Sequence, residues 1–200
     1  MTSRSHTAVE PESTRATDDA AAGPRTMRAV RYHEFGGADV LDVDEVSRPT
    51  PDRDEVLVEM RAASVNRVDV MFRTGEYGQV PLPSVPGGDG AGVVAAVGEA
   101  VDRFEPGERV VASGMDRAAG GTFAEYAAVP ETKLAALPAD VPFDTAAALA
   151  NVGVAAWLAL EELAGVQAGD RVLVHGGSGG VGHAAVQVAA ASGADVIATA

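Results

Sequence analysis

A glycine-rich loop near the end of the sequence constrains the fold more than any other feature. Residues 175–182 are HGGSGGVG, in which Gly177, Gly179 and Gly182 form the pattern G-x-G-x-x-G. The pattern alone is weak, because 23 of the 200 residues are glycine. Its surroundings make it specific, because apolar strand patterns flank it and a helix opens inside it. The expected strand, helix and strand cover residues 171–175, 181–192 and 195–198. Together they predict a β-α-β unit with parallel strands.

Each glycine of this pattern has a physical task in binding a dinucleotide. Gly177 permits a tight turn, Gly179 lets a pyrophosphate approach the backbone, and Gly182 allows the helix to pack closely on the strand. The N-terminus of the helix then offers free N–H groups to the phosphates. The alternative is a structural glycine turn of another α/β protein. The expected cofactor-binding residues are Gly177, Ser178, Gly179, Gly180, Val181 and Gly182.

The choice between NAD and NADP stays open at this level. The residue that contacts the ribose 2′ position is expected about 20 residues beyond the loop. The sequence ends at Ala200, where that residue would stand.

The first two thirds of the chain have a β texture. Several short strands separated by turns predict an antiparallel barrel or sandwich. One or two helical turns are expected over residues 66–72, ended by Gly75, and residues 81–92 are too rich in proline and glycine for regular structure. The expected strands cover residues 27–32, 40–46, 55–65, 91–97 and 122–129, and a turn followed by a strand is expected over residues 106–112.

The texture changes near Pro142. Helices are expected over residues 144–150 and 154–164, with Asp144 as the cap of the first and Gly165 ending the second. Residues 1–26 have no apolar period and predict a disordered tail, so Met27 is an alternative start. The expected domains are a disordered tail, a β domain and the start of a Rossmann dinucleotide-binding domain, over residues 1–26, 27–142 and 143–200.

Composition excludes several classes of function. The chain has no cysteine, which excludes disulfides, thiolate zinc sites and cysteine nucleophiles. Its net charge of −14 argues against nucleic acid as a partner, because phosphate binding needs clustered Lys and Arg. We find no apolar run of the roughly 18–20 residues that a membrane span needs, and no signal-peptide core. A cytoplasmic protein with no membrane partner is therefore expected.

The acidity itself indicates a salt-rich solvent. The chain has 29 acidic and 15 basic residues, and Lys133 is its one lysine. In molar salt the repulsion between carboxylates is screened, which favours a halophilic protein. The alternative is an acidic mesophilic protein whose genome prefers arginine to lysine.

Five stretches between Met27 and Ala200 share the pattern of one known family, and the most specific of them are VHGGSGGVG and VPGGDGAGVV. With these motifs the chain resembles the medium-chain dehydrogenase/reductase superfamily, and within it the zinc-independent quinone oxidoreductase (zeta-crystallin-like) branch. It implies a fold class of α/β plus β, with a GroES-like β domain followed by the start of a Rossmann domain. It further implies that NADPH binds in the cleft between them and reduces quinones or other conjugated carbonyls by hydride transfer, with NADH left open. A homodimer is expected for the full-length protein.

No metal site is expected. Zinc-dependent members of the superfamily have Gly-His-Glu where this chain has Gly87, Gly88 and Asp89, and a glycine has no ligand atom in its side chain. Catalytic zinc needs about three protein ligands, and the four histidines show no ligand spacing. Asp89 is interpreted as a turn residue or as a support for its neighbours.

The resemblance implies two catalytic residues, Asn66 beside the nicotinamide and Tyr77 in the substrate pocket. Each has a simpler alternative, since Asn66 is also a good helix cap and Tyr77 also suits a loop. The chain departs from the family at two positions. A cofactor-binding tyrosine of several relatives is replaced by Met71, and a threonine that faces the nicotinamide is replaced by Ala155.

Two other functions remain open. One is an enoyl or alkenal reductase on the same scaffold. The other is a truncated, non-catalytic fragment, because a Rossmann domain has two βαβαβ halves and two strands alone are marginal.

Overall fold

A computed structural model describes residues 25–115 and 120–200. The expected tail lies outside these residues as far as residue 24, and Thr26, which was assigned to it, already belongs to the first strand. The strands are β1 (Thr26–Tyr32), β2 (Leu41–Ser47), β3 (Glu55–Ala63), β4 (Gly90–Val97), β5 (Arg109–Ala112), β6 (Tyr126–Pro130), β7 (Leu134–Ala136), β8 (Arg171–Val174) and β9 (Asp195–Ala198). The α-helices are α1 (Arg67–Thr74), α2 (Phe143–Trp157) and α3 (Gly180–Ala191).

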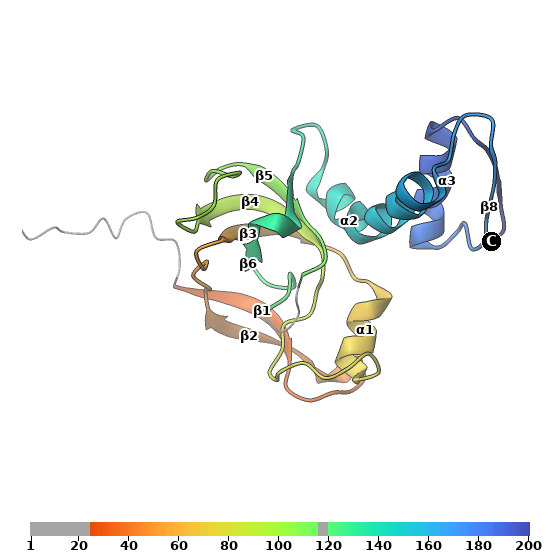
Figure 1. Ribbon diagram of the computed structural model, residues 1–200. Coiled ribbons are helices and arrows are strands. Elements are labelled where there is room, and N and C mark those ends of the chain that lie inside the picture. The colour runs from red at the N-terminus through yellow and green to blue at the C-terminus, as the bar shows by residue number, and fades with distance from the viewer. Residues whose placement is uncertain (1–24, 116–119) are drawn as a thin grey trace, which may run out of the picture.

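The β domain contains a five-stranded antiparallel sheet and a separate hairpin. The sheet has the order β6-β3-β4-β5-β7, and β1 pairs with β2. The hairpin joins the sheet through the segment before β6, where the Val30 amide donates to the Phe123 carbonyl at 2.8 Å. Figure 1 shows this domain on the left, with α2 leading from it to α3 and β8 on the right. The β-rich region expected from the sequence is therefore confirmed.

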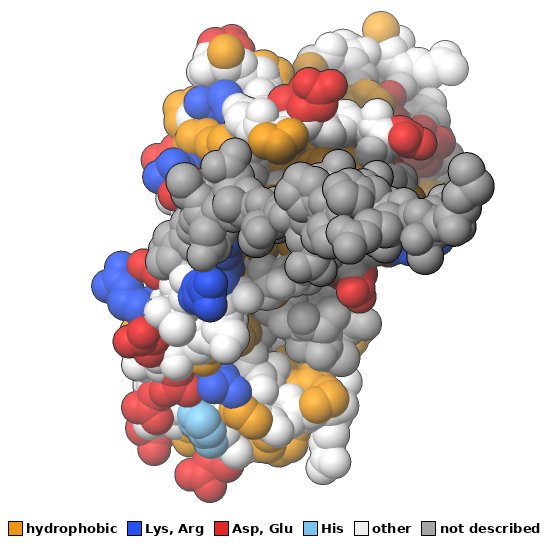
Figure 2. All heavy atoms as spheres, turned by 90° about the vertical axis from the view of Figure 1, so that its left-hand side faces the viewer, with side chains coloured by type: hydrophobic (Ala, Val, Ile, Leu, Met, Phe, Trp, Pro, Cys, Tyr) orange, Lys and Arg blue, Asp and Glu red, His pale blue; other side chains and the backbone are white. Residues whose placement is uncertain are grey.

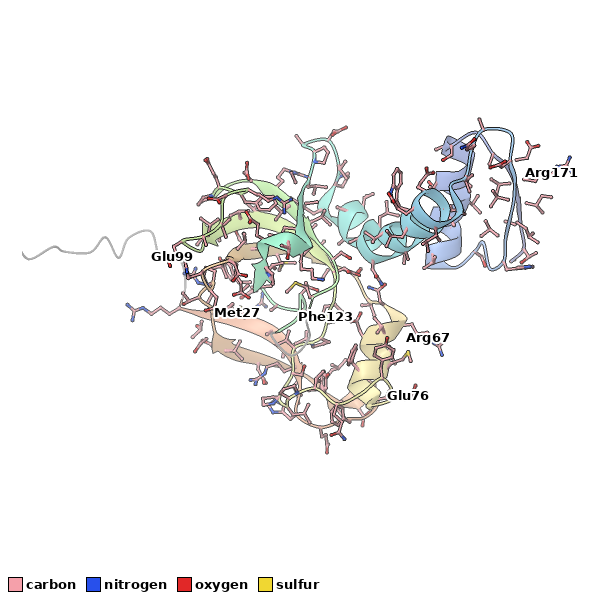
Figure 3. The ribbon with its side chains drawn as sticks, viewed as in Figure 1. Met27, Arg67, Glu76, Glu99, Phe123 and Arg171 are labelled. Atoms are coloured by element: carbon pink, nitrogen blue, oxygen red, sulfur yellow. The ribbon has the colours of Figure 1, made fainter. Side chains whose placement is uncertain are left out.

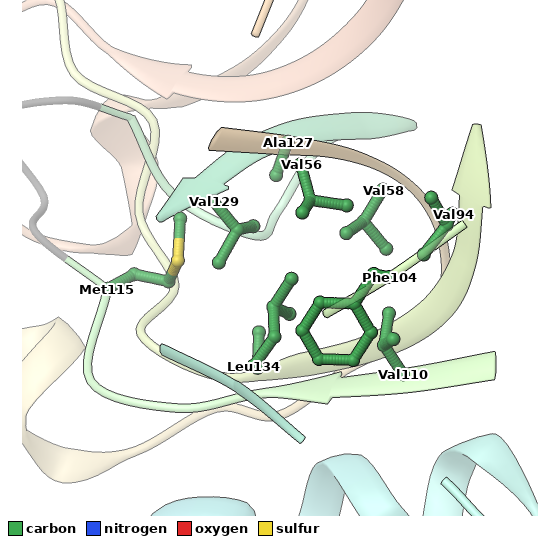
Figure 4. Packing of buried hydrophobic residues seen from close by; sticks show 10 residues of the cluster. Val56, Val58, Val94, Phe104, Val110, Met115, Ala127, Val129 and Leu134 are labelled. Atoms are coloured by element: carbon green, nitrogen blue, oxygen red, sulfur yellow. The ribbon is translucent and has the colours of Figure 1, made fainter. Parts of the chain in front are cut away.

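The core of the β domain follows from alternation along β3. Val56 and Val58 are fully buried and point into a cluster with Val94, Phe104 and Val110 (Figure 4). Leu57, between them, is also only 3% exposed, so this part of β3 is covered on both faces.

Strand β7 was missed by the sequence analysis. It has three residues, too few to show a period of two, and it exists because Leu134–Ala136 pairs with β5 at the edge of the sheet. The last predicted strand of the β domain was placed too early, since β6 begins only at Tyr126.

The two predicted helices over residues 144–164 form one continuous helix, so the predicted break was wrong. α2 continues from Trp157 into a π-helical stretch, Leu158–Ala164, and Gly165 ends it with φ of 62°. The helix is held at both ends. Ala146 and Ala147 pack with Ala91 of the β domain, whereas Ala156 and Leu160 pack with alanines of α3. Asp144 lies in the first turn, and Pro142 occupies the cap position.

The sequence was expected to contain no apolar run of the length that a membrane span needs, and this long helix contradicts that expectation. Phe143–Ala164 has 22 residues and an 18-residue window of mean hydropathy 1.5, so by length and composition it is able to cross a membrane. Alanines and glycines that separate the larger apolar residues hid it from a search for uninterrupted runs. Core helices of soluble proteins meet the same criterion.

The predicted β-α-β unit is confirmed. β8 and β9 are parallel, with Arg171 opposite Asp195 and Val174 opposite Ala198, and α3 connects them. Leu173 and Ile197 are 57% and 61% exposed, so one face of this two-stranded sheet is uncovered in the described chain. The fold class is thus α/β plus β, with the change of texture between Ala136 and Phe143.

Candidate active site

The glycine loop is tightly packed at two of its three motif positions. A Cβ on Gly182 would lie 2.1 Å from the carbonyl oxygen of Gly176, and a Cβ on Gly177 would lie 2.8 Å from the Cβ of Ala198. The close approach of helix and strand predicted at Gly182 is therefore present. Only glycine fits at both positions without moving the backbone.

The tight turn itself lies one residue earlier than expected. Gly176 has φ of 70°, in the left-handed region, whereas Gly177 has no positive φ. Gly177 instead lies against the chain after β9, where its amide donates to the Thr199 carbonyl at 2.7 Å. The turn role assigned to Gly177 thus belongs to Gly176.

The first turn of α3 presents backbone N–H groups. Gly179 is its cap, with extended backbone, and the amides of Gly180, Val181 and Gly182 follow, where a helix has no earlier carbonyl to accept from them. A Cβ on Gly180 would lie 3.1 Å from Cγ1 of Val152, so this end of the loop lies against α2. A narrow, glycine-lined helix N-terminus of this kind fits a pyrophosphate.

Asp89 organises the polar side of the β domain. It is 2% exposed, and its carboxylate accepts from Asn66 Nδ2 at 2.6 Å, Ser113 Oγ at 3.0 Å and the Gly114 amide at 3.3 Å. Ser64 Oγ lies 3.4 Å from the same group. Asp89 therefore joins the segments before α1, before β4 and after β5, and the interpretation as a support is correct.

Asn66 is the N-cap of α1, as its alternative interpretation predicted. It shares a capping box with Asp69, whose Oδ2 accepts from the Asn66 amide at 2.7 Å. The side-chain nitrogen of Asn66 donates to both Asp89 and Ser64, at 2.6 and 3.2 Å. A carboxylate only accepts hydrogen bonds, so this orientation of the amide is chemically required. Both Nδ2 hydrogens are occupied, and Oδ1 accepts from the Asp69 amide in the capping box, so one Oδ1 lone pair remains for a ligand.

A hollow beside Asp89 brings several of these groups together. Its polar side chains are Tyr77, Asp89 and Asn151, and its full lining is Val68, Phe72, Tyr77, Gly88, Asp89, Gly114 and Asn151. Tyr77 is 61% exposed and packs edge-on against Phe72, with ring centroids 5.1 Å apart. Figure 3 labels Arg67, at the start of α1, and Glu76, two residues after its end. The glycine loop and this hollow meet along α2, because Val152 contacts Gly180 and Asn151 lines the hollow.

The two residues that depart from the family's pattern, Met71 and Ala155, have no hydroxyl group in their side chains. Met71 lies in α1, where its carbonyl accepts from the Tyr77 amide at 3.2 Å, and Ala155 lies on the exposed side of α2. Asn151, one helical turn before Ala155, was missed by the sequence analysis. The available signal was a polar residue inside an otherwise small and apolar helix.

In the described part of the chain, the side chains that could bind a metal ion do not lie together. Residues 25–115 and 120–200 contain no cluster of three His, Asp or Glu side chains able to hold an ion. His33 lies 2.9 Å from Asp44, and His175 lies 3.3 Å from the Thr199 hydroxyl beside the glycine loop. His183 is exposed, and His6 falls outside the described residues.

Several known proteins are similar to this chain in both sequence and fold. Residues 52–139 match the family model "Alcohol dehydrogenase GroES-like domain". The quinone oxidoreductase of Homo sapiens is 42% identical over 182 residues, which cover 90% of this chain and 54% of that protein. The solved structure of Escherichia coli quinone oxidoreductase complexed with NADPH matches with a TM-score of 0.79 at 32% identity, over 86% of this chain and 52% of that one. The chain is thus similar, in both sequence and fold, to quinone oxidoreductases of the medium-chain dehydrogenase/reductase superfamily.

The chain spans about half the length of the curated relatives it matches. A further relative, 2-methylene-furan-3-one reductase of Solanum lycopersicum, is 38% identical over 174 residues, which cover 83% of this chain and 45% of that protein. Because the match covers 90% of this chain, it includes parts of both the β domain and the β-α-β unit.

Proposed function

We propose that this protein catalyses the NADPH-dependent reduction of quinones or other conjugated carbonyls by hydride transfer, without a metal ion. One observation carries the proposal: a glycine-lined helix N-terminus lies against the same helix, α2, that lines a polar hollow in the β domain. The first feature suits a pyrophosphate and the second suits a carbonyl substrate. The quinone oxidoreductase relatives support this pairing.

The chain's own residues position the reactants. The amides of Gly180, Val181 and Gly182 would hold the pyrophosphate, with Gly177, Ser178 and Gly179 in the loop that leads into the helix beside it. When bound, NADPH supplies a hydride to a ring carbon of a quinone or the β-carbon of an enone, and the carbonyl oxygen gains the negative charge and then a proton from water.

Asn66 and Tyr77 would have different tasks in this reaction. Asn66 has only acceptor capacity left, so it suits the amide hydrogens of a carboxamide and does not suit a negative oxygen. Tyr77 has a phenolic O–H at the hollow and would donate to the oxygen where charge develops.

The proposal has four further parts. The site works without a metal ion, the protein prefers NADPH to NADH, it is located in the cytoplasm, and it forms a homodimer. Gly88 in the place of a histidine ligand supports the first of these. The NADPH complex of the Escherichia coli relative supports the second.

The test is cofactor consumption by the chain. Loss of absorbance at the nicotinamide band is expected when NADPH is mixed with the protein and 1,4-naphthoquinone. Gly179→Asp, which places a carboxylate at the phosphate site, should weaken NADPH binding at least tenfold, a change of about 1.4 kcal/mol. Ala190→Asp adds the same charge at the other end of α3 and should leave binding nearly unchanged. Absence of NADPH oxidation with a panel of quinones and enones would contradict the proposal for this chain.

The tomato relative favours a second candidate function, reduction of enones in place of quinones. Comparing kcat/KM for a quinone and for a series of alkenals separates the two. A protein that binds NADPH, seen as a rise in Tm, and reduces neither class would instead be a non-catalytic fragment.

A further inference from the structure

We propose that Asn151 is a catalytic residue whose carboxamide donates a hydrogen bond to the substrate carbonyl oxygen as that oxygen becomes negative. The inference rests on the proposed function and assigns a role to a residue outside the glycine loop and outside the pair Asn66 and Tyr77. Three observations lead to it, concerning position, unused hydrogen-bonding capacity and local sequence.

The position of Asn151 joins the two parts of the site. It lines the hollow that also contains Tyr77 and Asp89, and it lines an adjoining hollow with Ser113 and Lys133. The next residue, Val152, lies against Gly180 of the glycine loop. A molecule held between the loop and Asp89 would therefore pass beside the Asn151 side chain.

The carboxamide of Asn151 has unused capacity. Its side chain is exposed, and no group in residues 25–115 or 120–200 forms a hydrogen bond with it. Asn66, the other asparagine of the chain, has both Nδ2 hydrogens occupied by Ser64 and Asp89. Of the two amides near the hollow, only that of Asn151 is able to donate to a substrate.

The local sequence gives Asn151 no structural reason to be asparagine. It stands inside α2, whose residues FDTAAALANVGVAAW are otherwise mostly alanine and larger apolar residues. Asparagine is a weaker helix former than alanine, because its side chain competes for backbone hydrogen bonds. Ala155 lies one turn further along the same face and has no polar group. Asn151 therefore supplies the polar group that this face of α2 presents to the hollow.

The chemical step requires such a donor. Hydride addition moves two electrons onto the conjugated system, the carbon–carbon double bond shifts toward the carbonyl, and the oxygen becomes an enolate or hydroquinone anion before water protonates it. A positioned N–H stabilises that anion more than the neutral carbonyl, so its loss lowers kcat more than it raises KM.

Steady-state kinetics of Asn151→Ala in the full chain provide the first test. We expect kcat with 1,4-naphthoquinone to fall at least tenfold, the KM for NADPH to stay within twofold, and Tm to be unchanged or higher. A merely structural asparagine would instead lower Tm and leave kcat unchanged. Asn151→Gln, which keeps the donor on a longer side chain, should recover part of kcat, whereas Asn151→Asp, an acceptor at neutral pH, should not. Thr145→Ala, in the first turn of the same helix, is the matched control for substitution within α2.

A second measurement is independent of turnover. The chain has two asparagines and three glutamines, so few side-chain amide signals appear in a ¹⁵N-correlated NMR spectrum, and Asn151→Ala identifies one pair. Titration with 2-hydroxy-1,4-naphthoquinone, an anion at neutral pH, should shift the Asn151 pair more than the Asn66 pair. If the wild-type chain oxidises no NADPH, the proposed function fails, and this titration alone decides the role of Asn151. An unshifted Asn151 pair, or wild-type kcat in Asn151→Ala, overturns the inference.

Discussion

At the scale of single residues, the buried carboxylate of Asp89 links segments that are far apart in the sequence. It accepts hydrogen bonds from Asn66, 23 residues earlier, and from Ser113, 24 residues later. Each donor is bound to a charged acceptor in a nearly solvent-free position, where hydrogen bonds to charged groups contribute most. The orientation of the Asn66 amide depends on this contact.

Removing Asp89 should therefore destabilise the β domain. Asp89→Ala leaves at least two donors without an acceptor, and we expect a loss of about 1–3 kcal/mol in the free energy of unfolding, measured by urea denaturation. Asp89→Asn keeps the shape and one acceptor oxygen, so its loss should be smaller. Equal losses for the two variants would show that packing, and not hydrogen bonding, explains the position.

Glu125 gives a pH-dependent contribution with a defined sign. The backbone N–H of Arg28, and then its guanidinium, hold the pKa of Glu125 below its ordinary value of 4.5. A lowered pKa means that the stabilisation is present above pH 4.5 and is lost as the pH falls through the folded-state value.

The difference in unfolding free energy between wild type and Glu125→Gln should accordingly shrink as the pH falls below 4.5, through the lowered pKa of Glu125. Arg28→Gln keeps the backbone donor, so it should retain most of the pH dependence. A difference that grows toward low pH would contradict the assignment. The measurement is urea denaturation at a series of pH values.

Local sequence was sufficient for some residues and insufficient for others. The cap role of Asn66 and the close packing at Gly182 were predictable, because each depends on neighbours within a few residues. The donors around Asp89 were not, because their contacts cross more than 20 residues of chain. Asn151 was missed because its significance depends on the hollow formed by α1, the segment before β4 and the segment after β5.

At the scale of elements, the β-α-β unit shows the best agreement between sequence and structure. The predicted strand over residues 195–198 matches β9, and the predicted helix over residues 181–192 is shifted by one residue from α3. These elements have a strong hydrophobic periodicity, and glycines stand at their boundaries. β7 and the unbroken α2 depend instead on partners, since β7 needs β5 and α2 is held by the β domain at one end and α3 at the other.

Two glycine substitutions compare the tightly packed loop of the β-α-β unit with the interior of α2. Gly182→Ala places a Cβ 2.1 Å from a backbone oxygen, so the loop must move, and we expect a loss of about 1–3 kcal/mol in the free energy of unfolding. Gly153→Ala, in the interior of α2, would have its nearest neighbour at 3.9 Å and should stabilise the chain by about 0.5–1 kcal/mol. Thermal and urea unfolding of the two variants measure both effects. A stabilised Gly182→Ala would contradict the close packing of the loop.

At the scale of the whole molecule, α2 connects the two kinds of structure in this chain. Its first half packs on the β domain and its second half packs on α3, while Asn151 and Val152 in the middle touch the hollow and the glycine loop. A single helix thus sets the distance between the proposed phosphate site and the proposed carbonyl site. Changes in the middle of α2 are therefore expected to affect catalysis more than folding.

The net charge of −14 is also a property of the whole molecule. Figure 2 shows carboxylate side chains spread over the described part of one face, with cationic side chains among them. Few of the acidic side chains in residues 25–115 and 120–200 form ion pairs, and a pair between exposed side chains, such as Arg53–Glu99 at 2.6 Å, contributes little to stability. Repulsion among the remaining carboxylates should destabilise the folded state at low ionic strength.

Stability should therefore rise with salt. Between about 0.1 M and about 1 M KCl the Debye length falls from about 10 Å to about 3 Å, which removes most of the repulsion between exposed charges. We expect Tm to increase over this range. The matched control replaces four exposed acids by their amides, namely Glu34, Asp42, Glu76 and Glu162, none of which forms an ion pair within the part of the chain that the structure describes. Because this variant carries four fewer negative charges, its Tm should be higher at low salt and should depend less on KCl. An equal salt dependence in both proteins would show that the effect arises from salt exclusion at the protein surface and not from the charge of the chain.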